Sequence, residues 1–79
     1  MTERSARADV RNPLLALPSA AEIVNLPAEA RAALRALLLD LRRDARARAE
    51  QCWKRNKAPL TAYWKAVAVY AGHTARLCR

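Results

Sequence analysis

The sequence predicts an all-α protein, a long antiparallel helical hairpin with a short N-terminal helix packed across it. Three observations support this fold class. Ala, Leu and Arg, which are strong helix formers, dominate the 79 residues. A single Gly and four Pro leave long stretches without a helix breaker. β-branched residues are few, so a sheet would have little material.

The N-terminal stretch divides into two parts. Residues 1–12 are polar and of mixed charge without periodicity, and we interpret them as a flexible basic arm. The next stretch, NPLLALPS, contains two prolines that disfavour a long helix. Its leucines, Leu14, Leu15 and Leu17, are too apolar to remain in solvent. We therefore expect this stretch to lie against the rest of the protein and to form part of a single helical domain that covers residues 13–79.

A short helix is predicted over residues 20–25. Ser19 and Glu22 have the spacing of a capping box, in which each side chain accepts a hydrogen bond from the backbone N–H of the other residue. Pro27 would end this helix and open the next one, because a residue in the first helical turn needs no N–H group.

The strongest helix signal runs over residues 28–56, where neither Gly nor Pro intervenes. Pro59 disfavours helical geometry at the residue before it, so this helix should end there. A third helix is predicted over residues 59–77. The short link between the two long helices predicts that they fold back antiparallel.

Each long helix carries an apolar face, and we expect these faces to form the seam of the hairpin. On a helical wheel, the face of the first helix comprises Ala30, Leu34, Leu37, Leu38, Leu41, Ala45 and Cys52. The face of the second comprises Leu60, Trp64, Val67, Ala71 and Cys78, flanked by Tyr63 and Tyr70. Lys65, Gly72 and Arg76 fall on the opposite side of the second helix, and we expect them to be exposed to solvent.

The charge distribution is the most informative feature for function. The formal charge of +8 attracts nucleic acid, anionic membranes or acidic protein surfaces. Part of it forms a stripe beside the predicted seam, made of Arg31, Arg35, Arg42 and Arg46. Among these, only Arg46 has an acidic residue at the spacing of a helical ion pair, namely Glu50. The stripe therefore remains largely unpaired.

Arginine beside an exposed aromatic ring suits contact with phosphates, carboxylates and flat groups. We therefore predict a partner-binding surface, which consists of Arg31, Arg35, Arg42, Arg46, Trp53 and Lys57. The alternative is a solvated helix face, since Arg is also a good helix former, with Trp53 packed on the N-terminal leucines.

No pattern in the sequence indicates a metal centre or a cofactor. Cys52, His73 and Cys78 are the soft ligand candidates, and the predicted hairpin separates its two cysteines by about 20 Å along the axis. That distance excludes a disulfide or a shared zinc ion. No signal-peptide pattern follows the start, and no apolar run approaches the roughly 20 residues of a membrane span. We expect a cytoplasmic protein with reduced thiols.

The acidic residues do not indicate an enzyme. Asp40 and Asp44 lie one helical turn apart, as a metal-binding or acid–base pair would. Arg43 and Arg48 stand at ion-pair spacing, so we interpret all four as surface ion pairs. There is no nucleophile motif and no Gly-rich phosphate loop. The sequence thus predicts a non-enzymatic protein without a small-molecule substrate.

In general character, the whole chain resembles the small proteins carried by phages and mobile elements of bacteria, the group that includes anti-CRISPR proteins. The resemblance covers the full length and involves no single motif, so it transfers no site residue. It implies a compact, non-enzymatic protein that blocks a host complex by covering a surface, often the one that receives nucleic acid. Many such inhibitors are acidic and imitate DNA. This chain is basic, so the resemblance implies arginines directed against an acidic or nucleic-acid-bearing surface.

Three functional interpretations follow. The first is an inhibitor or accessory factor of a nucleic-acid-handling complex, which binds an acidic protein surface, a nucleoprotein complex or nucleic acid directly. The second is an assembly module that forms a homodimer through a leftover apolar face, with Leu39 or the N-terminal leucines as docking residues. The third, ranked last, is a membrane-surface binder, because the hairpin itself uses the apolar faces that a membrane would need.

Overall fold

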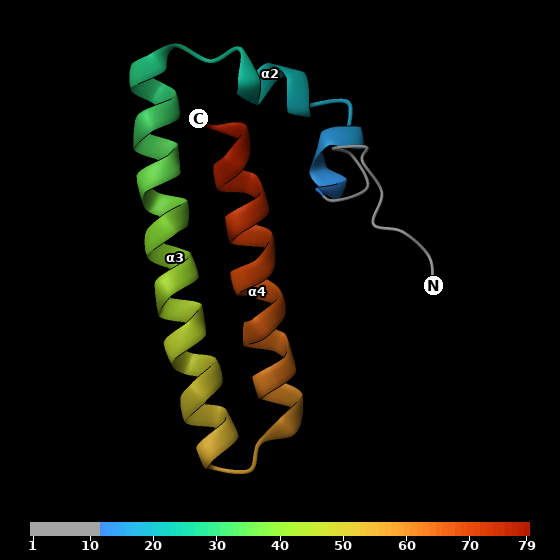
Figure 1. Cartoon of the computed structure of the whole chain (residues 1–79), viewed down its shortest axis with the longest axis vertical. Coiled ribbons are helices and arrows are strands. Elements are labelled where there is room, and N and C mark those ends of the chain that lie inside the picture. Colours follow the sequence, from blue (N-terminus) through green and yellow to red (C-terminus); the bar gives the residue numbers. More distant parts are fainter. Residues whose placement is uncertain (1–11) are drawn as a thin grey trace, which may run out of the picture.

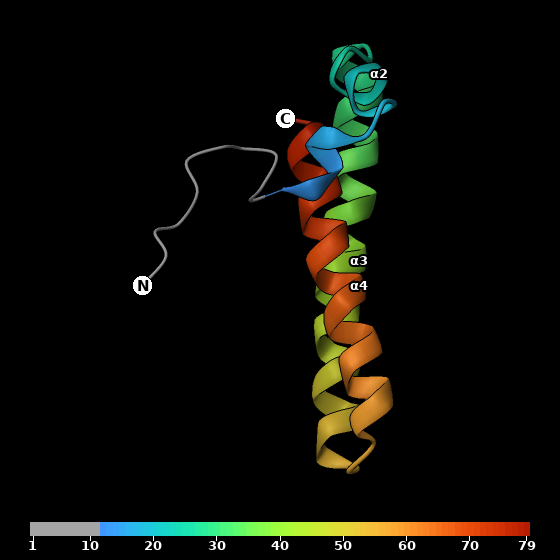
Figure 2. The same cartoon turned by 90° about the vertical axis from the view of Figure 1, so that its right-hand side faces the viewer.

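The computed structural model describes residues 12–79 as an all-α helical hairpin (Figure 1). The elements in chain order are the 3-10 helix η1 (Pro13–Ala16), α2 (Ala20–Val24), α3 (Ala28–Lys54) and α4 (Ala58–Leu77). Helices α3 and α4 lie antiparallel, and η1 and α2 pack at the open end of the hairpin (Figures 1 and 2). The predicted fold class is confirmed. The predicted arm lies outside the described residues except for its last residue.

That last residue, Asn12, anchors the N-terminal segment to α4. Its buried side chain donates from Nδ2 to the carbonyl of His73 at 2.9 Å, and its Oδ1 accepts from the N–H of Leu14 at 3.2 Å. Asn12 thus belongs to the folded domain. The leucines that follow cover the domain only in part, since Leu14 is half-buried whereas Leu15 and Leu17 are exposed.

The predicted capping box of α2 is wrong. Ser19 has helical backbone angles, φ −78° and ψ −5°, and its side chain makes no capping hydrogen bond. The N–H of Glu22 instead donates to the backbone carbonyl of Ser19 at 3.1 Å, and the N–H of Ala20 donates to that of Leu17 at 3.0 Å. These turns precede α2 without a break, so Ser19 never takes the extended geometry that a capping side chain requires.

The link between the long helices is a Schellman motif. Asn56 has a left-handed backbone with φ 58°, which asparagine tolerates better than most residues. Its N–H donates to the carbonyl of Trp53 at 3.0 Å, and the N–H of Lys57 donates to that of Cys52 at 2.9 Å. Because this motif closes the helix, α3 ends at Lys54, slightly before the boundary inferred from proline.

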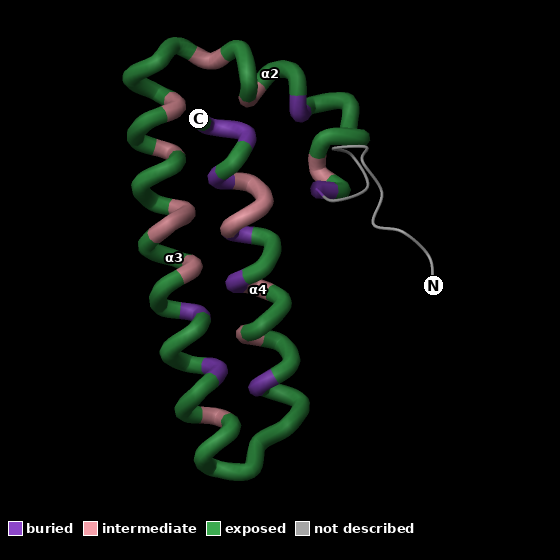
Figure 3. The backbone as a smooth tube through the Cα atoms, in the orientation of Figure 1, coloured by how far each residue is buried: buried purple, intermediate pink, exposed green. Residues whose placement is uncertain are grey.

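The buried positions of α3 and α4 lie along the sides on which the two helices face each other (Figure 3). Most of these positions hold alanine rather than leucine. Ala45 is completely buried, with 0% of its surface exposed, and no large side chain of residues 12–79 is fully buried. The other buried residues of α3 and α4 are small with the exception of Leu77 in the last turn of α4: Ala49, Thr61, Ala68, Ala71 and Ala75. Small side chains let the two backbones approach closely, but each removes little apolar area from water.

The prediction that large leucines fill the core is therefore wrong in part. Leu37 is 64% exposed and Leu60 is 47% exposed, and Ala30, Leu41, Tyr63 and Tyr70 are exposed as well. Leu34, Leu38, Cys52, Trp64 and Val67 are half-buried. On both helices, a row of alanines runs beside the row of large residues. The alanine rows fit together. Leu41, Tyr63 and Tyr70 lie on one side of them, whereas Leu39, Trp53 and Val69 line grooves on the other side.

Within residues 12–79, no helix combines the length and the hydrophobicity that a bilayer crossing demands. Both cysteines are free thiols, and of these Cys78 is buried and Cys52 half-buried.

Candidate basic binding face

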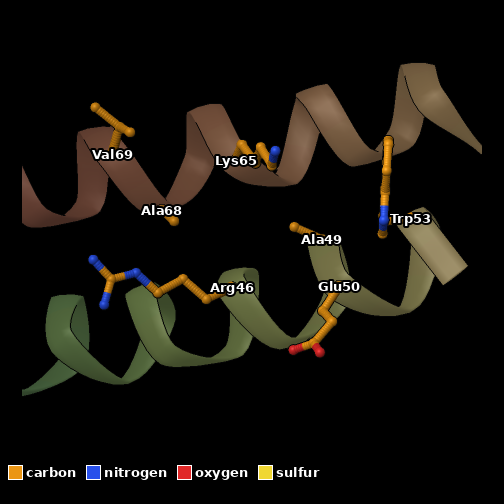
Figure 4. A pocket seen from close by; sticks show the side chains of 7 residues that line it. All are labelled: Arg46, Ala49, Glu50, Trp53, Lys65, Ala68 and Val69. Atoms are coloured by element: carbon orange, nitrogen blue, oxygen red, sulfur yellow. The ribbon is translucent and has the colours of Figure 1, made fainter.

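One face of the hairpin gathers basic side chains from both helices. They line two grooves between α3 and α4 that follow one another along the hairpin. The groove nearer the turn is lined by Arg46, Ala49, Glu50, Trp53, Lys65, Ala68 and Val69 (Figure 4). The groove nearer the open end is lined by Arg35, Leu39, Arg42, Gly72, Ala75, Arg76 and Arg79. We call the surface formed by Arg35, Arg42, Arg46, Trp53, Lys65 and Arg76 the basic face.

The groove nearer the turn has a volume of about 510 Å³ and a floor of small side chains. Ala49 and Ala68 lie on this floor, whereas Arg46 and Trp53 mark its two ends (Figure 4). The groove exists because the seam is made of alanine, which leaves space between the longer side chains at its edges. A flat or extended anionic group can therefore contact a ring and a cation at once.

Arg31 has partners within the chain. It is half-buried, and its Nε donates to the carbonyl of Leu26 at 2.9 Å, while its Nη1 donates to the carbonyl of Arg79. These bonds tie the start of α3 to the end of α4 and to the link that precedes α3. We therefore leave Arg31 out of the basic face.

Arg42 is half-buried and lies against Gly72. Its Cδ and Nη1 are 3.3 Å and 3.4 Å from the position that a Cβ would take on residue 72. Its Nε is buried and has no hydrogen-bond partner among residues 12–79. The expectation that Gly72 is wet and turned away from the seam is wrong, because this glycine faces α3. Its missing side chain makes room for the stem of Arg42.

Arg35 and Arg46 are exposed, and exposed cations of α4 lie on the same face. Lys65 and Arg76 are exposed to solvent, as predicted. However, they lie on the same side of the seam as the arginine stripe. The predicted α4 face of Leu60, Trp64, Val67, Ala71 and Cys78 placed Lys65 and Arg76 opposite the seam, so their position beside the arginines was missed. The row of Ala68 and Ala75 was the signal that could have placed Lys65 and Arg76 correctly.

Trp53 is 68% exposed at the end of the basic face toward the turn. The N-terminal leucines lie at the other end of the hairpin (Figure 1), so the alternative in which Trp53 packs on them is wrong. Lys57 is exposed in the link, where its carbonyl accepts hydrogen bonds from the N–H and the Oγ1 of Thr61. It stands beyond the residues that line the grooves.

Two ion pairs of residues 12–79, Arg43–Asp40 and Arg48–Asp44 at 2.8 Å, involve no residue that lines the two grooves. The third, Lys54–Glu50 at 3.6 Å, borders the basic face, because Glu50 lines the groove nearer the turn. The predicted ion pairs of Asp40 with Arg43 and of Asp44 with Arg48 are thus confirmed. The hydrogen bond that Arg48 donates to Asp44 raises the pKa of Arg48, and the same guanidinium lies 5.0 Å from the ring centroid of Trp64.

Neither a protein family, nor a curated protein, nor a solved structure matches this chain. Among residues 12–79, no group of three or more His, Cys, Asp and Glu side chains could hold a metal ion.

Proposed function

We propose that the protein is a non-enzymatic binding protein, an inhibitor or accessory factor that sets its basic face on a negatively charged surface of a nucleic-acid-handling complex. The supporting observation is the segregation of charge. Exposed cations of both helices share one face, on which Glu50 is the one carboxylate among the residues that line the two grooves, while Asp40 and Asp44 pair with Arg43 and Arg48 outside these grooves. A face on which one sign predominates attracts an oppositely charged partner and orients the encounter.

The spacing of the cations suits an extended partner. Arg35 and Arg42 lie about two turns apart on α3, and Arg46 lies about one turn further, with a rise of about 5.4 Å per turn. Lys65 and Arg76 form a parallel row on α4. A run of phosphates or carboxylates can therefore meet cations from both sides of the grooves. Guanidinium groups bind such groups through two parallel hydrogen bonds, which adds orientation to the attraction.

An affinity pull-down from a bacterial lysate, with and without nuclease, tests this proposal. We expect the chain to capture a nucleic-acid-handling complex, and a variant with the basic face neutralised to lose it. A partner kept after nuclease treatment is bound through an acidic protein surface. Equal capture by the wild type and the neutralised variant would contradict the proposal.

Direct binding to nucleic acid is a second candidate, favoured by the exposed ring of Trp53 beside Arg46 and Lys65. Bases stack on such rings while cations contact the phosphates. Fluorescence anisotropy with labelled single strands and duplexes across a salt series measures it. Direct binding predicts a linear fall of log K with log salt, and a slope that shrinks by roughly 0.7 to 0.9 for each contacting cation removed.

A further inference from the structure

The face of the hairpin opposite the basic face is apolar and open. Its central groove is lined by Leu38, Leu41, Tyr63, Val67, Tyr70 and Thr74. Tyr63 is 57% exposed and Tyr70 is 54% exposed. No Asp, Glu, Lys or Arg lines the groove. Large apolar side chains gathered on one face of a small protein mark an interaction surface.

The position of this face follows from the alanine seam. On α3, the row of Ala45 and Ala49 separates Leu41 on one side from Arg46 on the other. On α4, the row of Ala68 and Ala75 likewise separates Tyr70 from Arg76. The hairpin thus has a basic and an apolar surface that face in opposite directions.

A single hairpin is only one layer of helices thick. The shortest dimension of the Cα trace is 17 Å, against 42 Å and 38 Å for the other two. Stable domains usually pack two layers around a core of large apolar side chains. Here the seam holds alanines, whereas leucines and tyrosines of the apolar face meet solvent. A second layer on this face would supply the missing core.

The size of the apolar face fits a second copy of the same chain. The paired helices are about 30 Å long over the extent of α4 and about 20 Å wide, given the usual dimensions of helices. Each copy would thus bury at least about 600 Å², and the pair about 1,200 Å², which is the lower end of specific interfaces. The same hairpin, rotated by a two-fold axis, brings a matching face of equal length.

The charge distribution also permits this pairing. A formal charge of +8 makes two copies repel, but the exposed cations of the basic face would point outward on both sides of the pair. At the border of the apolar face, Arg48 is neutralised by Asp44 at 2.8 Å. Two copies that approach through these faces therefore bring together grooves that, among the described residues, no cation lines.

We propose that a second copy of this chain covers the apolar face, so that two hairpins form a four-helix bundle with Leu41, Tyr63 and Tyr70 in its core. The basic faces then lie on the two outer surfaces of the dimer. The proposal stands on the apolar face alone and is independent of the proposed function.

Sedimentation equilibrium of the full chain tests this proposal, together with the melting temperature at several protein concentrations. We expect a mass twice the 8.8 kDa of the chain and a melting temperature that rises with protein concentration. The variants Leu41→Glu and Tyr70→Glu place a charge on exposed positions of the apolar face. We expect them to reduce the mass to that of a monomer, whereas Arg46→Glu on the basic face leaves the dimer intact.

The wild-type measurements remain decisive if a charged variant fails to fold. A wild-type chain that stays monomeric over the whole soluble range, with a constant melting temperature, would overturn the proposal. A dimer that survives both Leu41→Glu and Tyr70→Glu would place the interface elsewhere and overturn it as well. So would a monomer that floats with anionic vesicles through these side chains, because a membrane would then be the occupant.

Discussion

Arg42 of α3 lies across Gly72 of α4, with its Cδ 3.3 Å from the point where a Cβ on residue 72 would stand. The contact joins a cation of the basic face to the seam between the two helices. It explains why the one glycine of the chain sits inside a helix, where it weakens helix formation by about 1 kcal/mol relative to alanine.

Gly72→Ala should therefore stabilise the protein by less than about 1 kcal/mol. Gly72 has no positive φ, so alanine fits the backbone, but the flexible stem of Arg42 must shift by a few tenths of an ångström, which offsets part of the gain. Chemical denaturation measures the change. The same substitution in an Arg42→Ala background should give the full gain, and a net loss of stability in both backgrounds would show that backbone spacing sets the limit.

Ala45→Leu should destabilise the hairpin by about 1–3 kcal/mol, because three more carbons must enter a seam in which Ala45 is 0% exposed. Ala47→Leu is the matched control. Ala47 is exposed on the same helix, and leucine is nearly as good a helix former as alanine. Thermal melts followed by circular dichroism compare the two, and equal melting temperatures would mean that the seam is looser than its burial indicates.

Arg31→Gln should cost about 1–3 kcal/mol of stability, because its side chain donates to the carbonyls of Leu26 and Arg79. Arg35→Gln, one turn along on the same helix, removes the same charge from an exposed side chain and should leave the melting temperature unchanged. Urea titration of both variants separates a structural arginine from a surface one. Similar midpoints for the two would remove the structural role of Arg31.

Arg35→Gln combined with Arg46→Gln should weaken partner binding at least tenfold without changing helicity or melting temperature. The control pair, Arg43→Gln with Arg48→Gln, removes the same charge from residues that pair with Asp40 and Asp44 outside the two grooves. Each pair is compared with wild type by binding titration to the captured partner. An equal loss of affinity in both pairs would mean that overall charge, rather than the basic face, drives binding.

Arg42 is deliberately kept in that pair of variants. Because it packs on Gly72 and carries a buried Nε, its substitution would change the seam as well as the charge. A loss of binding would then have two explanations. Arg35 and Arg46 are exposed, so their replacement tests the surface alone.

Local patterns in the sequence were sufficient for the elements and for part of the site. Proline and alanine content predicted the long helices, and the spacing of Asp40 and Asp44 to their arginines predicted ion pairs that the structure contains. These features depend on residues within one or two turns of each other. The predicted cap at Ser19 was wrong because it considered only the residues of the motif. A turn that begins before the motif determines the backbone conformation of Ser19.

Only the tertiary structure decided which row of each helix faces the other. On α3 and α4, an alanine row adjoins a row of large apolar residues. The wheel correctly placed Ala45 and Ala71 in the seam, but it centred the seam too far toward the large residues, since Leu37 and Leu60 are exposed. Which row packs in the seam depends on how the surfaces of the two helices fit together. In this structure Ala45, Ala68 and Ala75 are buried in close contact, whereas Leu37 remains exposed. Because the alanines face each other, Lys65 and Arg76 lie beside the arginines of α3, and leucines and tyrosines remain exposed on the other face. The sequence by itself determined a basic helical hairpin, and the packing of its smallest side chains decided what each of its faces carries.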